Sequence, residues 1–490
     1  MLYVGFAFSK NNNNAEDFYL GGRKMGPFVT AMSAEASDMS SWLLMGLPGV
    51  AYLSGICSAA WTAIGLGIGT WLNWFFVSRR LRRYSSNIGA ITVPDFFSKR
   101  YHDNKNIINA IAALVIIIFF VPYTASGFAA CGKLFHSLFG ADYMTAMILS
   151  ALVIVCYTLM GGFSAVCTTD LVQSIVMSIA LVTVMVFGIS KAGGLGAVMD
   201  NAHSLPGYFS LTELYDATTG NAVSYGGIIP IISTLAWGIG YFGMPHILVR
   251  FMSIEDEKKL VLSRRIATIW VVIAMTVGVF IGVVGLGMTK YGSINALEDP
   301  ETIIMAITNL LSKHGILPAL LAGVILAGVL AATMSTSDSQ LLAAASGISQ
   351  NVVKDFLGIK ISEKRELLLA RITIIAIAIV GVLMARDPNS SVFGIVSFAW
   401  AGFGGAFGAV MLFALFWKRC NLAGALSGMI AGGAVVFIWK YCVRPLGGTF
   451  DIYELLPAFL VSCVVIVIVS LLTKAPEEDI VKEFDAANAK

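Results

Sequence analysis

The stretch "SAEASDMSSW", residues 33–42, places two acidic side chains, Glu35 and Asp38, inside a segment that is otherwise apolar enough to cross a membrane. It follows "GPFVTAM" and precedes "LLMGLPGVAYL". A charge at the bilayer centre costs about 2.5–3.5 kcal/mol on insertion scales, so acidic residues at that depth mark ion or substrate sites. The stretch therefore predicts a functional site inside a membrane-spanning helix.

The rest of the chain has the composition of an integral membrane protein. Apolar residues make up 57% of it and charged residues only 12%, about half the fraction of a soluble domain. Runs of roughly 20 apolar residues, each long enough to span a bilayer as a helix, recur along its length. We predict an all-α integral membrane domain with twelve spans, at 27–52, 55–78, 106–132, 143–161, 168–190, 223–248, 266–288, 316–341, 367–386, 392–417, 421–441 and 454–473.

Basic residues concentrate in alternate connections between these spans. "RRLRR" at 79–83 and the lysines and arginines of 258–265 and 354–371 all fall on one side. Since cytoplasmic loops carry the excess of Lys and Arg, both ends of the twelve spans are expected in the cytoplasm. The polar tail, 474–490, is then cytoplasmic, as a surface helix or disordered, and the loop 191–222 is extracytoplasmic, without the pattern of a folded domain.

Two of the predicted spans are interrupted. The first meets "GLPG" shortly after Asp38, and the second contains "WGIGYFGMPHI", residues 237–247, with three glycines and a proline in eight residues. Unwound backbone is tolerated at membrane depth only where it faces protein or a water-filled cavity. Interruptions at corresponding positions of two halves are a sequence sign of a transporter site at the bilayer midplane.

Neutral oxygens around these interruptions suit a sodium ion. In "LAATMSTSDSQLL" (330–342), one carbonyl and two hydroxyls share a helical face, and two freed carbonyls of the first break can complete a cage beside Asp38. The alternative is that the hydroxyls only bond to carbonyls of their own preceding turn. The cage residues are Ala36, Met39, Ala332, Ser335 and Thr336.

Long motifs in the chain closely resemble the sodium/solute symporter family. They are "GPFVTAMSAEASDMSSWLLMGLPG", "GGFSAVCTTDLVQS", "WGIGYFGMPHILVRFM", "MSTSDSQLL" and "SFAWAGFGGAFG". The resemblance implies a five-plus-five inverted-repeat fold of the LeuT type, with two extra C-terminal helices and a first helix of which "MLYVGFAF" is a stub. The implied divisions are 1–26 (stub and cytoplasmic segment), 27–190 (first repeat), 191–222 (extracytoplasmic loop), 223–417 (second repeat), 418–473 (two further helices) and 474–490 (tail).

The resemblance also implies a function, sodium-coupled import of L-proline by alternating access, and places the five-residue cage and Asp38 at the sodium site. A half-helix N-terminus can take the carboxylate of a zwitterion, and aromatic faces can enclose its ring and amine. Because the chain departs from the family pattern at Glu35, Ser41 and Met244, another small carboxylate or amino acid is the alternative solute. The implied solute-binding residues are Ser40, Ser41, Tyr123, Trp237, Tyr241 and Pro245.

Five further polar residues have two interpretations each. Asp170 is either a helix cap or, with Asp338, part of a second cation or coupling site that some family members have. Arg23 matches a functional family arginine at the cytoplasmic entrance, or is a positive-inside anchor. Glu35 is either protonated and inert or adds proton sensitivity, since two adjacent buried carboxylates do not both ionise easily. His246 is a packed neutral histidine or a proton carrier.

Other functional classes fit the sequence less well. A sensor needs an output domain, a channel does not need two occluding sites, and an enzyme needs a metal cluster or an activated nucleophile, none of which the sequence shows. The prediction is therefore a multi-pass transporter of the bacterial cytoplasmic membrane. Its expected partners are sodium, a small solute and lipid, with no nucleic acid and no requirement for an oligomer.

Overall fold

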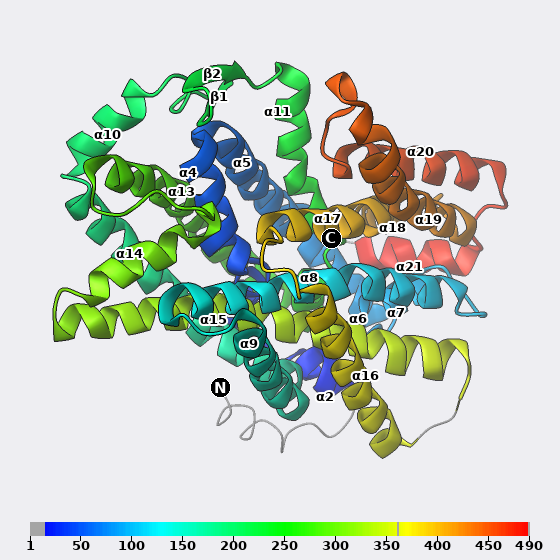
Figure 1. The fold of residues 1–490 in the computed structure, drawn as a ribbon. Coiled ribbons are helices and arrows are strands. Elements are labelled where there is room, and N and C mark those ends of the chain that lie inside the picture. The colour runs from blue at the N-terminus through cyan, green and yellow to red at the C-terminus, as the bar shows by residue number, and fades with distance from the viewer. Residues whose placement is uncertain (1–14, 360–361, 489–490) are drawn as a thin grey trace.

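The computed structural model describes residues 15–359 and 362–488, and these form an almost entirely helical bundle (Figure 1). The predicted stub at residues 1–8 lies outside the described residues. The helices are α2 (Ala15–Leu20), α3 (Pro27–Asp38), α4 (Leu47–Ser54), α5 (Ile56–Leu72), α6 (Ser78–Asn87), α7 (Val93–Arg100), α8 (Ile107–Phe139), α9 (Tyr143–Lys191), α10 (Leu195–Ser204), α11 (Ile228–Leu235), α12 (Pro245–Ser253), α13 (Leu260–Tyr291), α14 (Ile303–Ser312), α15 (Ile316–Ser346), α16 (Glu363–Met384), α17 (Val392–Phe403), α18 (Ala409–Phe416), α19 (Leu422–Ile438), α20 (Leu455–Leu472) and α21 (Glu478–Asn488).

The first predicted interruption is present. Helix α3 ends at Asp38, Met39 leaves the helical region with ψ of 68°, and the chain resumes as the π-helical turn η2 (Trp42–Gly46) and then α4. Every residue from Thr30 to Gly49 is buried, so the break faces protein rather than lipid. The freed backbone groups at Met39–Ser41 are therefore placed where membrane proteins tolerate them.

The second predicted interruption is present as well. Helix α11 passes into the 3₁₀ segment η4 (Ala236–Gly243), Met244 is extended, and α12 starts with Pro245 at its first position. The two halves of this span are bent by 47°. Proline is favoured at the first helical turn because its missing N–H would have no intrahelical partner there.

The twelve predicted spans all coincide with helical elements, except that the first residues of 223–248 belong to β2 and the loop after it. Among the described residues, eight single helices are long and apolar enough to cross a membrane, and the bent pair α11–η4–α12 makes a ninth. The remaining predicted spans lie on broken or shorter helices: α3–η2–α4, α5 and the first part of α9. Helix α9 continues through both 143–161 and 168–190, with a kink at Gly162.

The two ends of the bundle differ. At one end the connection between α9 and α11 carries the short helix α10 and the hairpin of β1 (Glu213–Asp216) and β2 (Asn221–Ser224), local structure that the sequence pattern did not predict (Figure 1). At the opposite end lie the basic helix α6 and its partner α21, and a helix is one of the two forms expected of the tail. Phe484 of α21 packs near Tyr84 of α6.

Large apolar side chains cover the outer faces of the long helices. Exposed examples occur on almost every one, among them Ile68, Leu152, Ile269, Leu320 and Ile372. A soluble monomer rarely exposes contiguous apolar patches of such extent. This surface is therefore the lipid-facing belt, and the polar residues of the broken helices lie inside it.

Candidate sodium and solute site

Helix α15 brings its hydroxyls against the break in α3. Ser335 donates a hydrogen bond of 2.8 Å to the Ala36 carbonyl and one of 3.1 Å to the Ala332 carbonyl, and Thr336 donates to the same Ala332 carbonyl at 3.2 Å. All four residues are buried. The structure thus brings these four of the five predicted cage residues together, and Met39 follows Ala36 by three residues at the break itself.

Asp38 joins the two interrupted helices. The Tyr241 hydroxyl, on η4, donates to Asp38 Oδ2 at 2.6 Å. The Asp38 carbonyl accepts from Trp42 Nε1 at 3.0 Å and from the Tyr123 hydroxyl at 3.3 Å. Asp38 is completely buried, and its carboxylate bonds toward the second break rather than to the hydroxyls of α15.

The predicted solute residues are placed unequally. Tyr123 and Tyr241 meet at Asp38, beside Ser40 and Ser41 of the first break. Trp237 instead packs on the neighbouring aromatic residues, with its ring centroid 6.0 Å from that of Trp42 and 5.2 Å from that of Tyr453. The six residues are all buried, so a solute can reach them only when helices move apart.

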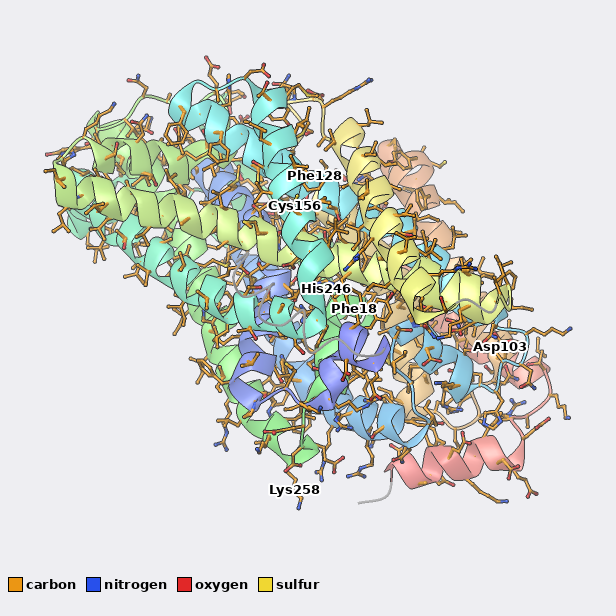
Figure 2. All side chains as sticks on the ribbon, turned by 90° about the horizontal axis from the view of Figure 1, so that it is seen from below. Phe18, Asp103, Phe128, Cys156, His246 and Lys258 are labelled. Carbon is orange, nitrogen blue, oxygen red and sulfur yellow. The ribbon has the colours of Figure 1, made fainter. Side chains whose placement is uncertain are left out.

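Pro245 faces a separate narrow cavity of about 30 Å³, enough for one or two water molecules. His246, Arg250 and Ser339 line the same cavity. His246 lies in the interior of the bundle, whereas Lys258 lies at its edge (Figure 2). Within the described part of the chain, neither ring nitrogen of His246 has a hydrogen-bond partner, and its ring packs 5.5 Å from that of Phe120. These contacts agree with a packed histidine.

A family profile described as "Sodium:solute symporter family" matches residues 18–432. The chain belongs to this family. The symporter is 41% identical over 478 residues to the osmoregulated proline transporter OpuE of Bacillus subtilis, a match that covers 97% of the chain and 93% of the relative. It is 40% identical over 501 residues to a sodium/proline symporter of Staphylococcus aureus, covering 100% of the chain and 94% of that protein.

Two solved structures share the fold. A Na⁺-coupled sialic acid symporter, in a substrate-bound outward-open state, matches with a TM-score of 0.78 at 20% identity and covers 97% of the symporter and 96% of that chain. A nucleobase-cation-symport-1 family transporter in a closed conformation matches with a TM-score of 0.56 at 14% identity, covering 96% and 98%. The predicted LeuT-like helical transporter fold is therefore confirmed, and the molecule is a multi-pass, sodium-coupled solute symporter rather than an enzyme.

Asp170 of the symporter is not a helix cap, and that interpretation is wrong. It lies well inside α9, because Thr168 and Thr169 donate their hydroxyls to carbonyls four residues back and the helix continues through them. Asp170 is fully buried and paired with Arg250 of α12 at 3.1 Å. Arg250 also donates to Ser339, the neighbour of Asp338 on α15.

Sequence reasoning missed Arg250, although a signal was available. A lone arginine in the apolar segment "HILVRFM" is costly in a membrane unless it is paired. The guanidinium donates to four helices, through Ser33 of α3, the His246 carbonyl of its own helix, Asp170 of α9 and Ser339 of α15. A protein cation thus occupies one side of Asp170, where the resemblance implied a second cation or coupling site.

Arg23 connects elements at the end of the bundle that carries α6. It donates to the Met252 carbonyl at the end of α12 at 2.8 Å, to Ser85 of α6, and pairs with Glu16 at 3.4 Å. Its side chain is only 11% exposed. These contacts fit a residue that holds neighbouring elements together more closely than they fit a free anchor in the lipid headgroups.

Sequence reasoning also missed the aromatic support of the solute site. Trp400 of α17 donates its indole N–H to the Trp237 carbonyl at 2.8 Å and meets the Tyr241 ring edge to face at 5.0 Å. Tyr453, just before α20, stacks on Trp237. The available signal for Trp400 was its place in "SFAWAGFGGAFG", one of the motifs that resemble the family.

Proposed function

We propose that this symporter imports L-proline together with Na⁺ across the bacterial cytoplasmic membrane. The observation that carries the proposal is the connection of the two breaks: Ala36 bonds to Ser335 of α15, and Asp38, two residues later, bonds to Tyr241 of η4. An ion held at the first contact and a solute held at the second would share one short unwound segment. Shared backbone of this kind gives the two ligands a physical route for coupling.

The sodium ion would be held by the five-residue cage, Ala36, Met39, Ala332, Ser335 and Thr336. In the present arrangement the Ser335 and Thr336 hydroxyls donate to the carbonyls of the same set. A bound cation would take those carbonyls and the hydroxyl lone pairs as ligands, and the hydroxyls would turn their protons away. Carbonyl and hydroxyl oxygens are the ligands that hard cations prefer.

The solute would lie between the breaks, against Ser40, Ser41, Tyr123, Trp237, Tyr241 and Pro245. Proline is a zwitterion with an apolar ring, and this wall offers both unwound backbone and aromatic faces. Support for proline itself comes from the two proline transporters that are 41% and 40% identical over nearly the whole chain. We assign residues 27–190 and 223–417 to the two inverted repeats, since each contains one of the two breaks.

Transport assays in proteoliposomes test the proposal. Purified symporter should take up radiolabelled L-proline when an inward Na⁺ gradient is imposed, and excess unlabelled proline should compete more strongly than other small amino acids or carboxylates. Sodium-driven uptake of a different solute, with no competition by proline, would replace proline by the alternative solute and leave the sodium coupling intact.

A further inference from the structure

A second group of oxygens lies on the other side of α3 from the cage. Glu35 Oε1 accepts a hydrogen bond of 3.0 Å from Trp74 Nε1, and Asp38 Oδ2 accepts the Tyr241 hydroxyl. Within the described residues, the other oxygen of each carboxylate, Glu35 Oε2 and Asp38 Oδ1, is buried without a hydrogen-bond partner. Glu35 and Asp38 are three residues apart and therefore share one helical face.

Neutral oxygens on α5 and its extension η3 (Asn73–Val77) complete the wall opposite this face. Thr70 Oγ1 and Asn73 Oδ1 are buried without a partner among the described residues, and both side chains are about 1% exposed. Trp74, which bonds Glu35, follows Thr70 by one helical turn, and Asn73 Nδ2 bonds the Tyr241 carbonyl at 3.1 Å. The unpartnered oxygens of this helix therefore lie beside the two carboxylates.

This group is distinct from the sodium cage. The cage uses the Ala36 carbonyl and the hydroxyls of α15, whereas the second group is made by Glu35, Asp38, α5 and η4. Only the short segment around Asp38 is common to both. Two sites built on different neighbouring helices can each hold an ion without sharing ligands.

The two carboxylates on this face lack a cationic partner. In the part of the chain that the structure describes, neither Glu35 nor Asp38 forms an ion pair, and the buried Arg250 pairs with Asp170. Buried carboxylates occur paired with cations or bound to metals. A set with two carboxylate oxygens, an amide oxygen and a hydroxyl is of the type that hard monovalent and divalent cations select.

We propose that Glu35 and Asp38, with Thr70 and Asn73, form a second sodium site, so that the symporter carries two sodium ions. The inference rests on the sodium coupling in the proposed function, because an ion here would travel with the ion in the cage. It gives Glu35, which the sequence leaves with two interpretations, a role as a cation ligand.

Equilibrium binding of ²²Na⁺ to the purified full-length chain, without solute, tests the inference. The wild type should bind two sodium ions, and Glu35→Gln, which keeps the size of the side chain, should bind one. Glu366→Gln is the matched control, because Glu366 is also buried but pairs with Lys354 outside the proposed site; it should bind two. Thr70→Val, which keeps the side-chain volume, should lower the affinity for one of the two sodium ions about tenfold and leave the affinity for the other unchanged.

The double variant Ser335→Ala/Thr336→Ala separates this site from the cage. This variant should no longer bind an ion in the cage, but it should still bind the ion at the Glu35 site, which Glu35→Gln does not bind. One bound ion in the wild type, or two in Glu35→Gln, would overturn the second site whatever happens in the cage variant. Two ions in the cage variant would instead contradict the cage, and so the proposed function, without touching the assignment of Glu35.

Discussion

At the scale of single residues, Asp38 has the most consequential position in the molecule. Its carboxylate accepts from Tyr241, and its carbonyl accepts from Trp42 and Tyr123. Three aromatic side chains that come from different elements are thus fixed by one residue at the end of α3. We therefore expect removal of its charge to alter the dependence of uptake on sodium, and removal of an aromatic neighbour to alter solute binding.

Asp38→Asn keeps the size of the side chain and an oxygen for Tyr241 but removes the negative charge that offsets the desolvation of Na⁺. We expect the sodium concentration for half-maximal uptake to rise at least tenfold, about 1.4 kcal/mol, or uptake to be lost. A sodium titration of solute uptake in proteoliposomes measures this. Asp142→Asn is the matched control, since Asp142 is an exposed N-cap of α9 and Asn caps equally well. An unchanged sodium dependence in Asp38→Asn would contradict its role.

Trp237→Ala should weaken solute binding and leave sodium binding unchanged. The indole packs among Trp42, Tyr453 and Trp400, whereas the proposed cage is formed by α15 and the end of α3. Aromatic contact with a cationic amine contributes about 0.5–2 kcal/mol, so the solute concentration for half-saturation should rise roughly threefold to thirtyfold. Sodium binding to the solute-free protein should not change. Trp71→Ala, a change at a lipid-facing residue, is the control; equal losses of solute and sodium binding in Trp237→Ala would show that the indole only holds the helix in place.

At the scale of elements, the second break depends on how closely its backbone approaches α5. A Cβ added at Gly69 would overlap the backbone of Gly238 in η4, and one added at Gly65 would meet the carbonyl of Leu235. Small residues let membrane helices approach to backbone contact. The glycines of α5 therefore place Thr70, Asn73 and Trp74 within reach of the two broken helices.

Gly69→Ala should destabilise the protein by about 1–3 kcal/mol, the ordinary cost of overpacking, because the clash is with backbone that cannot turn away. Gly67→Ala, two residues earlier on the same helix, is the control: its Cβ would meet only Val272 Cγ2, at 3.7 Å. That change should be neutral or stabilising by up to about 1 kcal/mol, since Ala favours the helix over Gly. Thermal unfolding in detergent compares the two, and similar midpoints for both variants would contradict a tight contact between α5 and η4.

At the scale of the whole molecule, both ends of the site are closed by polar contacts between distant segments. At one end, Glu301 accepts from Lys133 at 2.9 Å and from the N–H groups of Val392 and Phe393 at the start of α17. At the other end, Arg23 and Arg250 join α12 to its neighbours. If the proposed alternating access is right, we expect these two sets of contacts to open in turn, one breaking while the other is intact.

Uptake should respond to sodium and to voltage. A neutral zwitterion carried with one Na⁺ moves one charge inward, which at about 150 mV supplies roughly 3.5 kcal/mol. A tenfold sodium gradient adds about 1.4 kcal/mol, and the two together support roughly 10³–10⁴-fold accumulation. If a second sodium ion is carried, the maximum accumulation ratio is squared. Accumulation in proteoliposomes with imposed potentials measures it, and uptake that survives collapse of the sodium gradient while the voltage is kept would contradict sodium coupling.

The sequence by itself determined what depends on local pattern and composition. Apolar runs predict spans because no water is available in the bilayer to replace helical hydrogen bonds. The Gly–Pro cluster at 237–247 and the polar stretch at 33–42 predict breaks because those residues interrupt a helix locally. Sodium-coupled symport followed from long motifs, which the family match confirms. The residues assigned to the ion and the solute remain predictions.

Only the tertiary structure decided which polar groups meet. Asp170 and Arg250 are 80 residues apart, and Glu35 and Trp74 are 39 apart. The sequence around one residue of such a pair therefore does not predict its partner. Buried polar atoms are satisfied by whichever partners the packing of helices delivers, and that packing depends on side-chain volumes summed over several elements. For this reason the sequence predicted a function for Asp38 and left that of Glu35 open, while the structure alone placed Glu35 against Trp74 and Asp38 against the second break.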